Sequence, residues 1–272
     1  MMTRAFRVTV SERDEDVVIG ELYEAGTDGI EVGPATNDRV SLLAYFSNDV
    51  DPAGLRERLK DAAVEPVPVP EVDWVARFRE SFRPFRVGRF VVAPPWDRPP
   101  DDEDLLLVDP GRAFGTGAHE TTRLCLGALE DLARLRSLGR VIDVGAGTAI
   151  LSVAAARLGA RPVVASDIDP EAIDSARTHA GLNGVDLCVV RGDGARPFAL
   201  GAFDLVLANL TAPLLLAQAR DLAALRAPGG GLVLSGLLET DLREVGAAFA
   251  SCGSPETRRD GEWAALLYGE AS

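Results

Sequence analysis

The sequence has few cysteines, two histidines and no long apolar run. Its three cysteines are odd in number and widely separated, so we expect neither a disulfide framework nor a thiolate metal site. The most apolar stretch, residues 210–219, lies between Asn209 and Arg220 and is too short to span a membrane. Residues 1–18 alternate and then turn acidic, unlike a secretory signal. These absences predict a cytoplasmic protein with free thiols, no metal and no membrane contact.

Basic residues are outnumbered by acidic ones. The chain of 272 residues carries 42 acids and 28 bases, a formal net charge of −14 at pH 7. Such a charge repels free nucleic acid and favours a basic partner or a cationic ligand, although solubility alone also accounts for it. We therefore expect no stable binding of nucleic acid.

Residues 1–70 are predicted to form a small ferredoxin-like α+β domain. Residues 5–10 alternate with period two, and the following segments give the order strand, helix, strand, strand, helix, strand. The alternating prolines of residues 64–70 allow only an edge strand or an extended connector. This region has no cluster of catalytic side chains, which favours a role in substrate recognition.

Residues 71–92 are predicted to be a linker helix and joint. Trp74, Phe78 and Phe82 recur every four residues, and Pro84 ends the pattern. Five arginines accompany them: Arg77, Arg79, Arg83, Arg86 and Arg89. They could solvate the outer face of a packed helix or form an RNA-binding strip with the aromatic residues. The first interpretation is favoured because the patch is short and the rest of the chain is acidic.

Residues 93–272 alternate between strands and helices, which is typical of an α/β domain with a parallel sheet. The predicted strands are residues 105–110, 140–145, 161–167, 186–193, 203–209 and 230–236. The predicted helices are residues 121–135, 150–159, 170–184 and 214–230. Residues 256–261 and 262–269 could return as an antiparallel hairpin at the sheet edge.

The turn DVGAGTAIL, residues 143–151, indicates which nucleotide the domain binds. Gly145 and Gly147 lack β-carbons, so a ligand can approach the main chain. A dinucleotide fingerprint requires a third glycine where this chain has Ile150. Asp143 is expected to place a carboxylate in the mouth of the site, which disfavours a diphosphate and suits an ammonium and a sulfonium. This pattern favours S-adenosylmethionine over a nicotinamide dinucleotide.

Further acids follow the next two strands. Asp167 comes 22 residues after Gly145, where a carboxylate can bind both ribose hydroxyls, although a helix cap is the alternative. Asp169 is predicted to cap the helix that begins at Pro170. Asp193 ends the third strand at a place suited to the adenine amino group, and its role stays open.

A longer segment carries a more specific signal. Residues 109–126, DPGRAFGTGAHETTRLCL, resemble the signature of the ribosomal protein L-eleven (L11) methyltransferases of the PrmA type. The similarity covers nearly the whole chain, including the small domain, the tryptophan-containing joint and FDLVLANLTAPL. The resemblance implies a Rossmann-like class I methyltransferase. Its expected activity is methylation of lysine ε-amines and the N-terminal α-amine of L11, free or before ribosome assembly.

The resemblance also implies site residues. The cofactor contacts carried over by motif are Thr122 in HETT, Gly145 in DVGAG, Asp167 in SDID and Asn209 in LANL. The chain departs from the family at Ala149, where a glycine is usual, and we expect this methyl to tighten the loop without closing it. Taken alone, Thr122 could equally be a helix residue without a ligand.

Asn209 is the candidate catalytic residue. Its neutral amide oxygen can accept an N–H bond and orient the nitrogen lone pair without retaining the extra proton, whereas a turn asparagine is the alternative. His119 could act as a general base or make a structural hydrogen bond in its glycine-rich loop. His179 is expected to be solvated on a polar helix face.

Other functions stay open at this point. A class I N-methyltransferase that acts on a different protein or a small-molecule amine is the main alternative. Methyltransferases of glutamine amides carry Pro-Pro-Tyr after the fourth-strand asparagine, whereas this chain has Leu210, Thr211 and Ala212. An NAD-dependent oxidoreductase is disfavoured by Ile150 and Asp143, and an RNA-binding module by the net charge.

Overall fold

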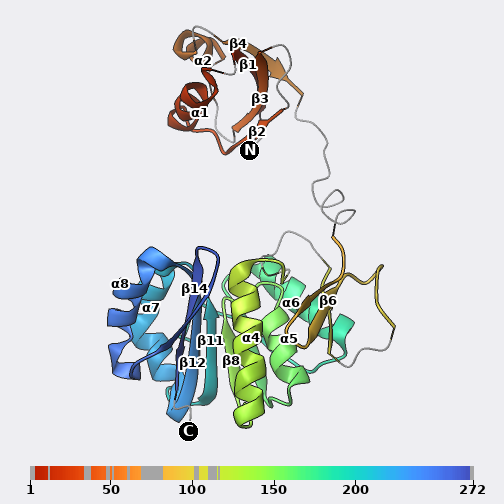
Figure 1. The fold of residues 1–272 in the computed structure, drawn as a ribbon, viewed down its shortest axis with the longest axis vertical. Coiled ribbons are helices and arrows are strands. Elements are labelled where there is room, and N and C mark those ends of the chain that lie inside the picture. The colour runs from red at the N-terminus through yellow and green to blue at the C-terminus, as the bar shows by residue number, and fades with distance from the viewer. Residues whose placement is uncertain are drawn as a thin grey trace. The chain divides into compact units, whose positions relative to one another are not determined.

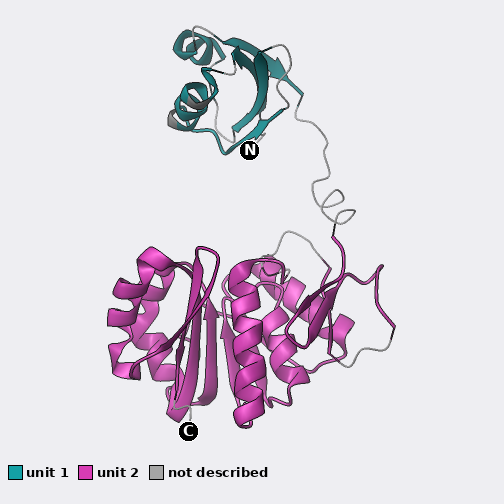
Figure 2. Cartoon of the chain, in the orientation of Figure 1, with its two compact units in different colours: residues 1–73 teal, residues 74–272 magenta. Residues whose placement is uncertain are grey.

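The chain divides into two compact units, residues 1–73 and 74–272 (Figure 2). The computed structural model describes residues 4–11, 13–33, 38–46, 50, 52–59, 62–68, 82–100, 104–109, 115 and 117–269. Most of the predicted linker helix, residues 71–81, lies outside these ranges, as do residues 110–114 of the signature segment.

The first unit has the predicted order of elements. They are β1 (Arg4–Ser11), α1 (Glu15–Glu24), β2 (Gly29–Val32), β3 (Arg39–Phe46), α2 (Pro52–Arg58) and β4 (Ala63–Val67). The sheet has the order β2-β3-β1-β4, with β1 antiparallel to both of its neighbours. Alternation in β1 buries Phe6, Val8 and Val10 against Leu22 of α1 and Leu55 of α2. The proline-containing strand β4 lies at an edge, as predicted.

The second unit is built on a seven-stranded sheet with the order β10-β9-β8-β11-β12-β14-β13. Its strands are β8 (Val141–Val144), β9 (Val163–Asp167), β10 (Cys188–Arg191), β11 (Phe203–Asn209), β12 (Arg226–Leu238), β13 (Glu256–Asp260) and β14 (Trp263–Tyr268). The first five in spatial order pair in parallel, and β14 is antiparallel to β12 and β13. The predicted parallel core and C-terminal hairpin are both confirmed.

Helices cover both faces of this sheet. They are α4 (Glu120–Leu135), α5 (Ile150–Arg157), α6 (Pro170–Asn183), α7 (Ala212–Leu225) and α8 (Leu242–Ala248), with short 3-10 turns at Glu239–Asp241 and Ala250–Cys252. Figure 1 shows α4, α5 and α6 on one side and α7 and α8 on the other. Strands enclosed in this way need apolar side chains on both faces. In the part of the chain that the structure describes, no helix is long and apolar enough to cross a membrane.

The segment at residues 105–110 was predicted as a strand of the main sheet, and this is wrong. It forms β7 (Leu105–Leu107) in a separate three-stranded sheet with β5 (Phe85–Val87) and β6 (Phe90–Ala93). On the outer edge of β7, the main-chain groups of Leu107 bond to a side chain. Asn183 accepts from Leu107 N–H and donates to Leu107 C=O, both at 2.8 Å. An amide side chain of α6 thus replaces a neighbouring strand.

The small sheet also explains the burial of His179. We expected this histidine to be solvated, and that expectation is wrong. His179 is 3% exposed, and its Nε2 accepts a hydrogen bond from Asp109 N–H at 3.0 Å. Burial lowers the pKa of His179. The segment that follows β7 covers this face of α6, a contact that no local pattern in the sequence could indicate.

The side-chain cap at the N-terminus of α6 is a local interaction whose contribution to stability can be measured. Asp169 Oδ1 accepts from Glu171 N–H at 2.9 Å, the predicted cap. We expect Asp169→Ala to lower the free energy of unfolding by about 1 kcal/mol, because a helix N–H loses its partner. Urea unfolding followed by tryptophan fluorescence measures the change.

The matched control lies on the same helix. Asp174 is highly exposed and pairs with Arg177 at 3.1 Å, so Asp174→Ala should change stability by less than about 0.5 kcal/mol. Equal losses in the two variants would contradict the assignment of Asp169 as the cap.

Candidate functional site

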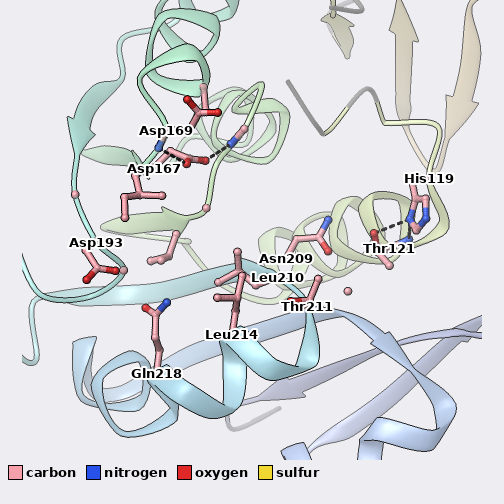
Figure 3. A pocket seen from close by; sticks show the side chains of 18 of the residues that line it. His119, Thr121, Asp167, Asp169, Asp193, Asn209, Leu210, Thr211, Leu214 and Gln218 are labelled. Atoms are coloured by element: carbon pink, nitrogen blue, oxygen red, sulfur yellow. Dashed lines mark hydrogen bonds between the residues drawn. The ribbon is translucent and has the colours of Figure 1, made fainter. Parts of the chain in front are cut away.

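A pocket of about 540 Å³ lies at the carboxyl ends of the parallel strands. Its walls come from the turns after β8, β9, β10 and β11, from the start of α4 and from one face of α7. The strand order reverses between β8 and β11, the place where open α/β sheets bind ligands. His119 and Thr121 stand at one end of the pocket, and Asp193 and Gln218 at the other (Figure 3).

The glycine turn after β8 lets the chain approach its neighbours closely. Gly145 has a φ of +75°, and a β-carbon there would overlap the side chain of Leu210. Ala149 also adopts the left-handed conformation, with φ 61° and ψ 25°, at the N-cap of α5. Its methyl packs with Ala165 and Ala176 behind the turn. Alanine at this position does not line the pocket, in agreement with the expectation that it leaves the loop open.

Asp167 joins two of the turns that form the pocket. One carboxylate oxygen accepts from Gly147 N–H and the other from Asp169 N–H, both at 3.0 Å. Since Asp169 itself caps α6, Asp167 is not the cap of that helix. Its carboxylate lines the pocket at the end of β9, between the glycine turn and α6 (Figure 3).

The structure corrects the expected position of Asp143. Its side chain is 1% exposed, accepts a hydrogen bond from Ser152 Oγ at 2.7 Å and is not among the residues that line the pocket. Asp143 lies within β8, one residue before its end, and faces α5. Burial raises the pKa of this carboxyl to about 6, and the charge of Asp167 adds to the rise. A carboxylate therefore lies behind the glycine turn and not in the mouth of the site.

Asn209 and Thr122 meet at the wall of the pocket. Asn209 is the last residue of β11, and its Nδ2 donates to Thr122 Oγ1 at 3.5 Å. The Oδ1 atom of Asn209 is buried and has no hydrogen-bond partner among the described residues. Thr122 is 1% exposed and lies behind Asn209, whereas its neighbour Thr121 lines the pocket.

His119 caps the start of α4 with its side chain. Its Nδ1 accepts from Thr121 N–H at 3.3 Å and lies 2.9 Å from Thr121 Oγ1, so His119 is the N-cap of the helix. The neutral ring then carries its proton on Nε2. The ring also meets Trp263 edge to face, with centroids 4.7 Å apart. These contacts support the structural alternative over a general base.

Asp193 lines the far end of the pocket as predicted in position, but its carboxylate is half exposed and pairs with Arg196 at 2.6 Å. Sequence reasoning missed Leu214 and Gln218, which follow Thr211 at helical spacing on one face of α7. It also missed Trp263, which reaches the pocket because the antiparallel β14 begins where the parallel strands end.

The sheet order and the pocket at its switch point define this unit as a Rossmann-like α/β domain with a candidate nucleotide site. The family profile described as "Ribosomal protein L11 methyltransferase (PrmA)" matches residues 5–270. The chain belongs to the family of ribosomal protein L11 methyltransferases.

Relatives and solved structures agree with this family. The chain is 46% identical over 288 residues to a ribosomal protein L11 methyltransferase of Geobacter metallireducens, with 93% of each chain covered. It is 42% identical over 262 residues to that of Geobacter sulfurreducens, covering 89% of this chain and 84% of the relative. A ribosomal protein L11 methylase of Lactobacillus delbrueckii aligns with a TM-score of 0.61 and 30% identity, over 70% of this chain and all of that one.

Asp143 makes stability depend on pH in a predictable direction. Its folded-state pKa of about 6 exceeds the ordinary value of 3.8, so stability falls as the pH rises from 3.8 to about 6 and stays lower above that range, where the buried group is ionised. We expect Asp143→Asn to raise the free energy of unfolding at pH 8 by up to about 3 kcal/mol. The advantage should shrink to about half at pH 5, because Asp143 then binds a proton on folding.

Urea unfolding of both proteins at pH 5 and pH 8 measures this difference. A stability gain independent of pH would contradict the raised pKa, and a loss at both values would show that the bond from Ser152 requires the carboxylate.

Proposed function

We propose that this protein transfers methyl groups from S-adenosylmethionine to the lysine ε-amines and the N-terminal α-amine of ribosomal protein L11. Family membership supports the protein substrate. The observation that carries the chemistry is the buried carbonyl oxygen of Asn209, which lacks a partner among the described residues at the wall of the switch-point pocket. An acceptor that is buried without a hydrogen bond is unfavourable unless a ligand supplies the donor.

The residues around the pocket fit the proposed cofactor. Asp167 would accept hydrogen bonds from the ribose hydroxyls with the lone pairs that its two main-chain bonds leave free. The bare main chain at Gly145 and Gly147 would admit the ligand close to the turn, and Asp193 would accept from the adenine amino group. Asp143 is ionised above pH 6 and would stabilise a cationic ligand from behind the turn. Thr122 would act through Asn209, which it contacts.

The cofactor would supply a methyl group made electrophilic by a sulfonium, so the protein needs to present a neutral amine in line with it. Removing the proton from a lysine ammonium of pKa near 10.4 costs roughly 5 kcal/mol at pH 7, and removing it from an α-ammonium costs about 1 kcal/mol. Asn209 Oδ1 would accept one N–H and orient the lone pair. Because the amide is neutral, it would not retain the ammonium proton, which would pass to water. Positioning the nitrogen about 3 Å from the methyl carbon supplies the remaining gain.

We also propose that residues 1–70 form a recognition domain for L11, taken as a free protein before its assembly into the ribosome. The net charge of −14 supports a basic protein partner over free nucleic acid. Residues 71–92 would join this domain to the methyltransferase domain, residues 93–272, although the strands of residues 85–93 already pack within the second unit.

Mass spectrometry tests the substrate directly. Purified L11 incubated with the protein and S-adenosylmethionine carrying a deuterated methyl group should gain labelled methyls on lysine and N-terminal amines. A second small basic protein serves as the control and should stay unlabelled. Labelling of neither protein, or of both equally, would contradict the proposed substrate.

Replacing Asn209 tests its role in the reaction. We expect Asn209→Ala to keep S-adenosylmethionine affinity within tenfold, measured by calorimetry, while turnover on L11 falls more than a hundredfold. The reason is that the lost hydrogen bond forms with the reacting amine and strengthens in the transition state. Turnover at the wild-type rate would remove Asn209 from the mechanism.

A further inference from the structure

Gln218 lies at the end of the pocket opposite His119, and the proposed reaction gives it no part. It projects from α7 one helical turn after Leu214, on the face that lines the pocket. Figure 3 shows its side chain directed across this end of the pocket toward Asp193.

The amide of Gln218 lies directly against the main chain at Gly194. Gly194 has a φ of +56°, and a β-carbon there would overlap Oε1 of Gln218 and lie 2.6 Å from its Cδ. The carboxamide therefore packs directly on the turn that carries Asp193. In the described part of the chain, this amide makes no hydrogen bond with another residue. The donor and the acceptor of this amide thus lie side by side at the pocket wall.

This pair of groups matches one edge of adenine. A carboxamide offers an acceptor beside a donor, and adenine offers its N6–H donor beside the N7 acceptor, an edge that glutamine reads by two hydrogen bonds. Because N6 carries two hydrogens, Asp193 can accept one while Gln218 accepts the other. Hypoxanthine presents an oxygen at the same position and would face both acceptors without a proton to share.

We propose that Gln218 is a specificity-determining residue that reads the N6 and N7 edge of the cofactor's adenine base. The inference rests on the proposed function, since it requires that this pocket bind S-adenosylmethionine. Gln218 on α7 would then contact the adenine base together with the carboxylate of Asp193, which lies on the turn after β10.

Calorimetry with two product analogues tests the proposal on the full chain. The ligands are S-adenosylhomocysteine and S-inosylhomocysteine, which differ at the adenine amino group. We expect Gln218→Met, a variant of similar size, to lose roughly five- to twentyfold in affinity for the adenosyl compound and less than twofold for the inosyl compound. Arg220→Met is the matched control: Arg220 is exposed on α7 outside this pocket and its variant should keep the wild-type preference.

The outcomes separate this inference from the proposed function. Wild-type preference for adenine in Gln218→Met overturns the role of Gln218 and leaves the cofactor assignment intact. Binding of neither compound by the wild type overturns both. Gln218→Asn withdraws the amide by one methylene and should lose the preference as well, so it replaces the methionine variant if that protein fails to give a folded circular dichroism spectrum.

Discussion

The pocket depends on the two hydrogen bonds that Asp167 accepts. They come from Gly147 N–H in the turn after β8 and from Asp169 N–H in the turn after β9. Turns of this kind have unpaired main-chain donors, and a single carboxylate satisfies one from each. The two strand-to-helix connections thereby become one wall, and the carboxylate that joins them is the group that we propose binds the ribose.

Buried polar side chains support the same wall from behind. Ser152 on α5 donates to Asp143 within β8, and Thr122 on α4 accepts from Asn209 at the end of β11. Each pair links a strand end to a different helix. Polar groups in a core restrict the arrangement of their neighbours more than apolar ones, because only a few geometries satisfy them. This packing sets the position of Asn209, whose Nδ2 donates to Thr122 while its Oδ1 has no partner among the described residues.

Local patterns predicted most of this fold and part of the site. The alternation of short apolar strands with helices predicted the parallel sheet. Asp167 was predicted from its place at the end of the strand after the glycine turn, and Asn209 from its resemblance to the family motif. The patterns failed at residues 105–107, whose apolar run is compatible with any buried strand. Whether such a run joins the main sheet depends on a partner, and here Asn183, far along the chain, bonds to Leu107.

The amino-acid sequence by itself determined the elements of the first unit, the strands of the seven-stranded sheet, the glycine turn and the acids that follow the strands, since these depend on residues close together in the chain. Only the tertiary structure decided that Asp143 faces α5 and that His179 is buried under the segment after β7. It also brought Trp263 and Gln218 to opposite parts of one pocket. These outcomes depend on how distant segments pair and pack, and the free energy of that packing is not present in any short stretch of sequence.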